Sequence, residues 1–260
     1  MKTSLLILGA FCIAYNLGSI LHELGHGVAV WLSGGKISSI VLHPFSWNWI
    51  SYHSNPNPLL ASWGGVLFGV LFAVALSSIA LLARSPFLTP LYLLAGCALA
   101  TNGIYLAVAA VADVADAGNL LSQGVPRAFL VAVGLFLMLL SFLWSSLIQP
   151  LIGIPADVPL GRRLLTLHAG ITPYLIAMAA YALLFAKAES PLFLAFAGAG
   201  IVAVTAIAIS GHVLRNVTVG LPRLGYIDPS WASAIVLLTV GIVVVVWELI
   251  YFAPQYTPGW

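Results

Sequence analysis

Residues 4–32 read SLLILGAFCIAYNLGSILHELGHGVAVWL, an apolar stretch long enough to cross a membrane as a single helix. A spanning helix needs roughly 20 mostly apolar residues. Seven stretches of this kind occur along the chain: residues 4–32, 59–83, 91–115, 127–149, 164–186, 191–213 and 231–253. The sequence therefore predicts an all-α, polytopic integral membrane protein with about six to seven transmembrane helices.

The composition excludes the soluble classes of protein. Of 260 residues, 62% are hydrophobic and only 6% are charged, whereas a soluble domain carries about a quarter charged residues. The mean hydropathy of +1.09 agrees. We expect a multi-pass protein of the cell membrane, surrounded by the lipid bilayer and with no nucleic-acid partner. Cys12 and Cys97 lie in apolar runs without metal-ligand spacing, which favours small core residues over a disulfide.

The loop after the first stretch differs from the other loops. Residues 36–53 read KISSIVLHPFSWNWISYH, in which β-branched and aromatic residues flank a Pro-Phe-Ser turn. This pattern favours a short β-hairpin at the membrane interface, with an irregular interfacial loop as the alternative. His43 and His53 lie in this segment, where each could contact substrate or metal or simply be a hydrogen-bonded loop residue.

The first apolar stretch contains the motif His22-Glu23-Leu24-Gly25-His26. On a helix, His22 and His26 lie one turn apart on one face, so both imidazoles can reach one cation. Glu23 is adjacent and can contact a water molecule bound to that metal. Each ionisable residue inside a membrane span costs about 2.5–3.5 kcal/mol on insertion scales, so three in five positions are hard to explain by packing. The motif predicts a Zn²⁺ site for amide hydrolysis.

Two histidines leave a catalytic zinc ion one protein ligand short, because such sites usually supply three. The best donors lie at the end of the third stretch, where residues 112–121 read ADVADAGNLL. Asp113 and Asp116 are three apart, so we expect them to share one helical face. The third stretch crosses the membrane in the same direction as the first, so its end returns to the depth of the histidines. Either aspartate could be the third ligand.

With these motifs, the sequence resembles the site-2 protease family of intramembrane zinc metallopeptidases. The resemblance lies in HELGHGVAVWLSGGKISSIVLHPF at residues 22–45 and in ASWGG at residues 61–65, which looks like the glycine-rich helix that follows the hairpin in that family. It covers roughly residues 5–121. It implies a single membrane domain over residues 1–260, with a three-helix catalytic core at 1–121 and additional transmembrane helices at 122–260.

The resemblance also implies roles for individual residues. His22 and His26 would bind zinc, and Glu23 would be the general base. The third ligand of the family is an aspartate in an Asn-x-x-Pro-x-x-x-Leu-Asp-Gly motif, from which this sequence departs. The D-x-G-x-L pattern that begins at Asp116 favours this residue over Asp113.

We therefore expect a zinc metalloendopeptidase that hydrolyses a transmembrane or juxtamembrane segment of another membrane protein. A helical substrate hides its amides in its own hydrogen bonds and must unwind first, and the hairpin at 36–53 could hold the unwound strand by edge pairing. The alternatives are a membrane protein that binds or transports metal without proteolysis and a catalytically silent scaffold. The intact Glu23 argues against the scaffold.

Overall fold

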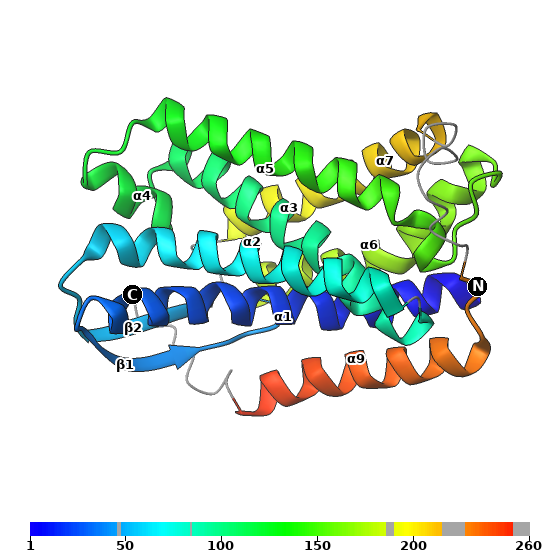
Figure 1. The fold of residues 1–260 in the computed structure, drawn as a ribbon, viewed down its shortest axis with the longest axis horizontal. Helices are drawn as coiled ribbons and strands as arrows, with labels where there is room; N and C mark the ends of the chain where they lie inside the picture. The colour runs from blue at the N-terminus through cyan, green and yellow to red at the C-terminus, as the bar shows by residue number, and fades with distance from the viewer. Residues whose placement is uncertain (46–47, 84, 186–189, 215–226, 252–260) are drawn as a thin grey trace.

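The computed structural model describes residues 1–45, 48–83, 85–185, 190–214 and 227–251 (Figure 1). Its helices are α1 (Lys2–Leu32), α2 (Pro58–Ala83), α3 (Thr89–Ala112), α4 (Ala115–Ser122), α5 (Arg127–Leu147), α6 (Leu160–Phe185), α7 (Ser190–Val213) and α9 (Trp231–Tyr251). Two short 3₁₀ helices, η1 (Pro86–Leu88) and η2 (Gln149–Ile152), precede α3 and follow α5. The strands β1 (Lys36–Val41) and β2 (Trp49–Ser54) follow α1.

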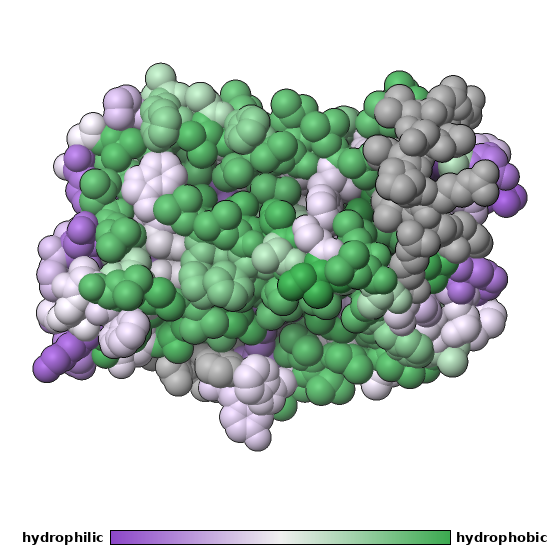
Figure 2. Space-filling view, in the orientation of Figure 1, coloured by the Kyte–Doolittle hydropathy of each residue, from purple (hydrophilic) through white to green (hydrophobic). Residues whose placement is uncertain are grey.

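The helices confirm the prediction of an all-α, multi-pass membrane protein. Within the described residues, α1, α2, α3, α5, α6 and α9 are long and apolar enough to span a membrane, and α7 adds the shorter apolar helix Ala197–Val213. Large apolar side chains lie on the outside, such as Leu71 at 66% and Leu82 at 83% exposure on α2. Figure 2 shows apolar residues over the middle of the molecule and polar residues at its two ends, as a lipid-facing surface requires.

Helix α1 runs through the middle of the bundle and packs against α2, α3, α6 and α9. Its contact with α2 is made by glycines. A β-carbon on Gly25 would stand 2.3 Å from the carbonyl oxygen of Gly64, and one on Gly64 would stand 2.5 Å from that of Gly25. Small residues let membrane helices approach backbone to backbone. The start of α2 is therefore held directly against the histidine motif of α1.

A left-handed glycine ends α1 and turns the chain into the hairpin. The amide of Gly34 donates to the carbonyl of Trp31 at 3.0 Å, and the amide of Gly35 donates to that of Val30 at 2.8 Å. Gly34 has φ 81°, a conformation that glycine adopts without the steric cost of a β-carbon. The Gly-Gly pair thus satisfies the last turn of the helix and redirects the backbone.

The predicted hairpin is confirmed, and it lies beside the histidine motif. Strands β1 and β2 pair antiparallel, with Val41 opposite Trp49. A β-carbon on Gly27 would stand 3.1 Å from Cδ1 of Ile37 and 3.2 Å from Cδ1 of Ile50. Both strands therefore pack on α1 one residue beyond His26.

The end of the third span differs from the sequence prediction. Helix α3 stops at Ala112, Asp113 takes a left-handed conformation with φ 58° and ψ 49°, and the chain re-enters a separate short helix, α4. Ala115 also has a positive φ of 54°. The prediction that Asp113 and Asp116 share one helical face is therefore wrong, because the left-handed residues Asp113 and Ala115 interrupt the helix between them.

Candidate metal centre

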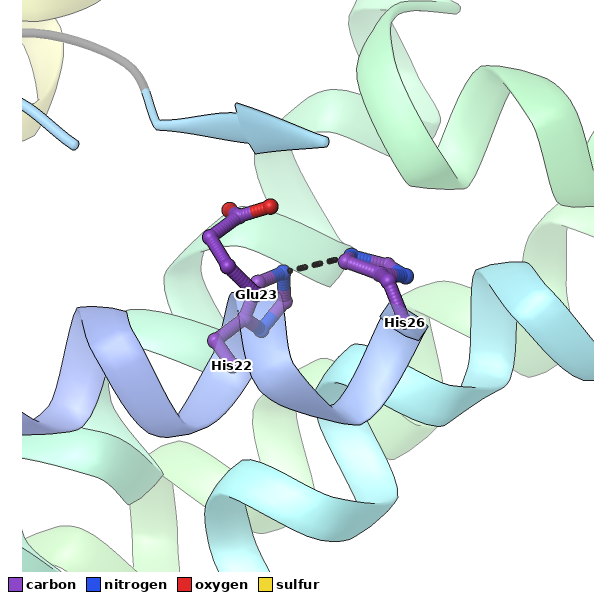
Figure 3. Close-up of side chains that lie close together, drawn as sticks. All are labelled: His22, Glu23 and His26. Atoms are coloured by element: carbon purple, nitrogen blue, oxygen red, sulfur yellow. Dashed lines mark hydrogen bonds between the residues drawn. The ribbon is translucent and has the colours of Figure 1, made fainter. Parts of the chain in front are cut away.

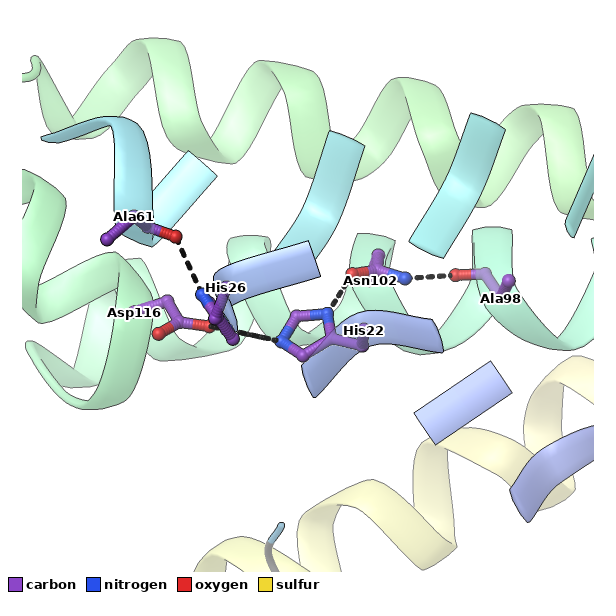
Figure 4. A network of polar contacts seen from close by, with 6 residues as sticks. All are labelled: His22, His26, Ala61, Ala98, Asn102 and Asp116. Carbon is purple, nitrogen blue, oxygen red and sulfur yellow. Dashed lines mark hydrogen bonds and ion pairs between the residues drawn. The ribbon is translucent and has the colours of Figure 1, made fainter. Parts of the chain in front are cut away.

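Three side chains from two helices converge at one point in the bundle (Figure 4). His22 and His26 project from consecutive turns of α1, and their Nε2 atoms lie 3.1 Å apart (Figure 3). Oδ2 of Asp116, from α4, lies 3.2 Å from Nε2 of His22 and 3.1 Å from Nε2 of His26. These three atoms form a nearly equilateral triangle.

The triangle has the dimensions of one face of a zinc coordination shell. Zinc binds histidine nitrogen at about 2.0–2.1 Å and carboxylate oxygen at about 2.0–2.2 Å, so tetrahedral ligand atoms stand about 3.3–3.5 Å apart. The edges of 3.1, 3.1 and 3.2 Å are close to that spacing. Two imidazoles and one carboxylate are also a donor set that catalytic zinc sites use. The residues present therefore fit a zinc ion.

Hydrogen bonds on the far side of each imidazole orient its ring. Nδ1 of His26 lies 2.7 Å from the carbonyl oxygen of Ala61, which can only accept, so His26 donates from Nδ1. Asn102 donates its amide N–H to the carbonyl of Ala98 at 2.8 Å, which leaves its Oδ1 to accept from Nδ1 of His22 at 2.9 Å. In neutral imidazoles, both Nε2 lone pairs then face Asp116. Metal-binding histidines are oriented in this way.

Glu23 lies beside the triangle and is 5% exposed. Its carboxylate, like the two histidine nitrogens, belongs to a cluster of ligand atoms that all lie within 4.8 Å of one another. His22 and Glu23 both line a cavity of about 70 Å³, with Ser19 and Tyr105 among the other lining residues. Such a volume holds a few water molecules. The carboxylate of Glu23 and the imidazole of His22 thus border a space that water can enter.

Packing of α4 brings Asp116 to the histidines. Ala117 and Leu120 on this short helix are fully buried, and α4 packs against α2 and α3. Burial by itself raises the pKa of the Asp116 carboxyl, but positive charge on His26 and His22 outweighs burial and lowers this pKa below its usual range. The site therefore favours positive charge next to Asp116.

The structure does not bring Asp113 to the histidines. Its side chain is 60% exposed and forms a 3.4 Å ion pair with Arg127. Neither hairpin histidine belongs to the cluster of ligand atoms that His22 and His26 form in the described residues. His43 is buried and accepts a hydrogen bond from the amide of Phe45 at 3.1 Å, whereas His53 is exposed. Burial lowers the pKa of His43 to about 4. Of the two predicted aspartates, only Asp116 can join His22 and His26.

Sequence reasoning missed several contributors to this site. Gly65 makes room for the imidazoles, since a β-carbon there would stand 2.4 Å from Nε2 of His26. The carbonyl of Ala61 orients His26, and a backbone group carries no side-chain signal. Tyr105 places its ring 6.0 Å from that of His22, edge to face. The position of Asn102 inside an apolar span does indicate a buried hydrogen bond, because an amide there needs a partner. The sequence could not show that this partner is His22.

No protein-family model, curated protein or solved structure matches the chain.

Proposed function

We propose that this chain is a zinc-dependent intramembrane endopeptidase of the site-2 protease type, acting in the cell membrane. The observation that carries the proposal is the convergence of Nε2 of His22, Nε2 of His26 and Oδ2 of Asp116 within 3.2 Å of one another. Glu23 stands beside them, inside a bundle of membrane-spanning helices. Intramembrane ionisable groups are costly and are kept for function.

His22, His26 and Asp116 would hold the Zn²⁺ ion. When bound, zinc polarises a carbonyl oxygen and lowers the pKa of its bound water to about 7. Asn102 and the carbonyl of Ala61 keep both imidazoles in the orientation that presents Nε2. These two acceptors also raise the basicity of the rings to which they are bonded.

Glu23 moves the proton in this proposal. Its carboxylate accepts a proton from the attacking water as the water oxygen bonds to the carbonyl carbon of the substrate. The C–N bond then breaks, and Glu23 returns the proton to the departing amide nitrogen, so the carboxylate is regenerated. The products are a new carboxyl group and a new amine. Burial of Glu23 beside the histidines keeps it within reach of the cavity.

The substrate is a transmembrane or juxtamembrane segment of another membrane protein. A helical segment must unwind before its amides are open to attack, and the released backbone groups then need partners. Strand β1 can supply them by edge pairing, because four of its six residues are exposed and the hairpin packs on α1 next to His26. The substrate strand would lie alongside β1 and lead its scissile bond to Glu23.

The proposal is tested by comparing new protein termini in membranes that contain the wild type or Glu23→Gln. We expect wild-type membranes to accumulate new termini within membrane segments and Glu23→Gln membranes to lack them, while the purified variant keeps its zinc. Glu248→Gln is the matched control, since Glu248 is also buried in a membrane helix, α9, and does not line the cavity. Cleavage by Glu23→Gln at the wild-type rate would overturn the mechanism.

The same variant separates proteolysis from metal transport. If the protein instead moves metal, zinc flux into liposomes persists in Glu23→Gln and no new termini form in the wild type.

A further inference from the structure

A second cavity, of about 130 Å³, adjoins the candidate metal centre. It lies among α1, α3, α5, α6 and α7, and its walls are mainly aliphatic and aromatic. Its lining includes the apolar residues Leu167, Ile171, Leu175, Met178 and Val204. The hydroxyl group of Ser141 in this wall donates to the carbonyl of Gly96 at 2.8 Å and so already has a partner. The cavity is therefore built for an apolar group.

This cavity shares a wall with the space at the histidines. Tyr15, Cys97 and Thr101 line both cavities. Thr101 directly precedes Asn102, the residue that holds His22. A group bound at His22 and Glu23 thus lies one side-chain layer from the apolar space.

The volume matches one large side chain. An engineered apolar cavity of about 150 Å³ binds benzene and stays free of water, so about 130 Å³ accommodates a leucine side chain or a phenylalanine ring closely. Small residues create this space, since Gly96, Ala100, Gly200 and Ala203 all line it. A larger side chain at Ala100 or Ala203 would take up part of this volume.

We propose that this cavity receives one large apolar side chain, leucine or phenylalanine, of the substrate segment, and thereby selects the bond that is cut. The inference rests on the proposed proteolytic function and names its specificity pocket. Because lipid tails are as apolar as the cavity, transfer from the bilayer brings little hydrophobic gain. Selection then comes from close packing against Leu175 and Met178, which a small side chain cannot achieve. A lipid acyl chain is the competing occupant.

Occupancy is tested without cleavage, in the Glu23→Gln background. A synthetic single-span peptide carrying photo-leucine at successive positions is reconstituted with the protein in phosphatidylcholine liposomes and irradiated, and cross-linked residues are found by mass spectrometry. We expect one peptide position to label Leu175, Met178 or Val204. Adding Ala203→Phe should reduce this label at least about tenfold, because the ring fills the cavity.

Val202→Phe is the matched control, because Val202 adjoins Ala203 on α7 but is 68% exposed on the outer surface. It should leave the label unchanged. If Ala203→Phe fails to elute as a single species, Ala100→Leu fills the cavity from α3 instead. Labelling of the cavity by a photoactivatable phosphatidylcholine but by no peptide position would overturn the proposal.

Specificity is tested with the same peptide in the wild type, with leucine, phenylalanine, alanine or glycine beside the cleaved bond. We expect leucine and phenylalanine peptides to be cut at least about tenfold faster than glycine peptides, and Ala203→Phe to reverse that preference. If the wild type and Ala203→Phe each cleave all four peptides at the same rate, the cavity is not a specificity pocket, and the proposed proteolytic function is unaffected. Cavity labelling without any cleavage by the wild type would instead count against the proposed function.

Discussion

Gly65 stands directly against His26: a β-carbon on Gly65 would lie 2.4 Å from Nε2 of that histidine and 2.9 Å from Cε1 of His22. Real β-carbons do not approach other atoms so closely, so the site exists only because position 65 has no side chain. The glycine on α2 therefore sets the room available to the two imidazoles on α1.

Gly65→Ala should weaken zinc binding. The added methyl group displaces at least one imidazole, and the loss of one ligand position should lower zinc affinity at least about 100-fold. Zinc per chain, measured by mass spectrometry after dialysis against a weak chelator, checks this. Gly198→Ala on α7 is the control, since a β-carbon there meets no atom within 4 Å. Equal zinc content in the two variants would contradict the packing argument.

Substitution of Asp116 should abolish zinc binding, whereas substitution of Asp113 should not. Asp116→Ala removes the carboxylate that lies 3.1–3.2 Å from both histidines, so we expect stoichiometric zinc to be lost. Asp113→Ala removes only an exposed ion pair with Arg127, and exposed pairs contribute about 0–1 kcal/mol. It should keep its zinc and its unfolding temperature to within a few degrees. Loss of zinc from Asp113→Ala, with zinc retained by Asp116→Ala, would contradict the assignment of Asp116 as the third ligand.

Asn102→Ala should weaken zinc binding by about 10–100-fold without abolishing it, because Asn102 orients His22 from behind. Competition with a fluorescent chelator gives the affinity. Asn16→Ala serves as control: Asn16 is equally buried in a membrane helix, but its amide donates to the carbonyl of Cys12 at 2.7 Å. That variant should be less stable yet bind zinc like the wild type.

The free energy of unfolding should decrease at acidic pH because His43 becomes protonated. Burial lowers the pKa of this histidine to about 4 in the folded protein, whereas an unfolded chain titrates near 6.5. The fold accommodates only the neutral imidazole, so stability is unaffected above about pH 6.5 and decreases as the pH falls towards about 4, by up to about 3 kcal/mol. Thermal unfolding should show a weaker pH dependence in His43→Gln, while His53→Gln, at an exposed position, should behave like the wild type.

The sequence was sufficient to predict the membrane helices, the pair of histidines and the two aspartates from which a third ligand could come. Apolar length alone placed the helices to within a few residues, because a membrane penalises every interruption by charge or free backbone. The hairpin followed from its β-branched and aromatic residues. His22 and His26 could be paired from their spacing on one helix, since that geometry is local.

The rest depends on contacts between distant segments. Apolar character continues past Ala112, so hydropathy could not show that Asp113 adopts a left-handed conformation and ends α3. Only that interruption of the helix puts Asp116 opposite the histidines and leaves Asp113 paired with Arg127. The space left by Gly65 and the carbonyl of Ala61 are likewise properties of the α1–α2 contact, which no local pattern encodes.

The most direct test of the central claim, that His22, His26 and Asp116 hold one metal ion, is X-ray absorption at the zinc edge of the purified protein. We expect one zinc per chain with a shell of nitrogen and oxygen atoms at about 2.0–2.2 Å, two of them from imidazoles. In Asp116→Ala that spectrum should vanish or change, and in Asp113→Ala it should not. Purified protein that takes up no zinc, or a shell containing sulfur at about 2.3 Å, would contradict it.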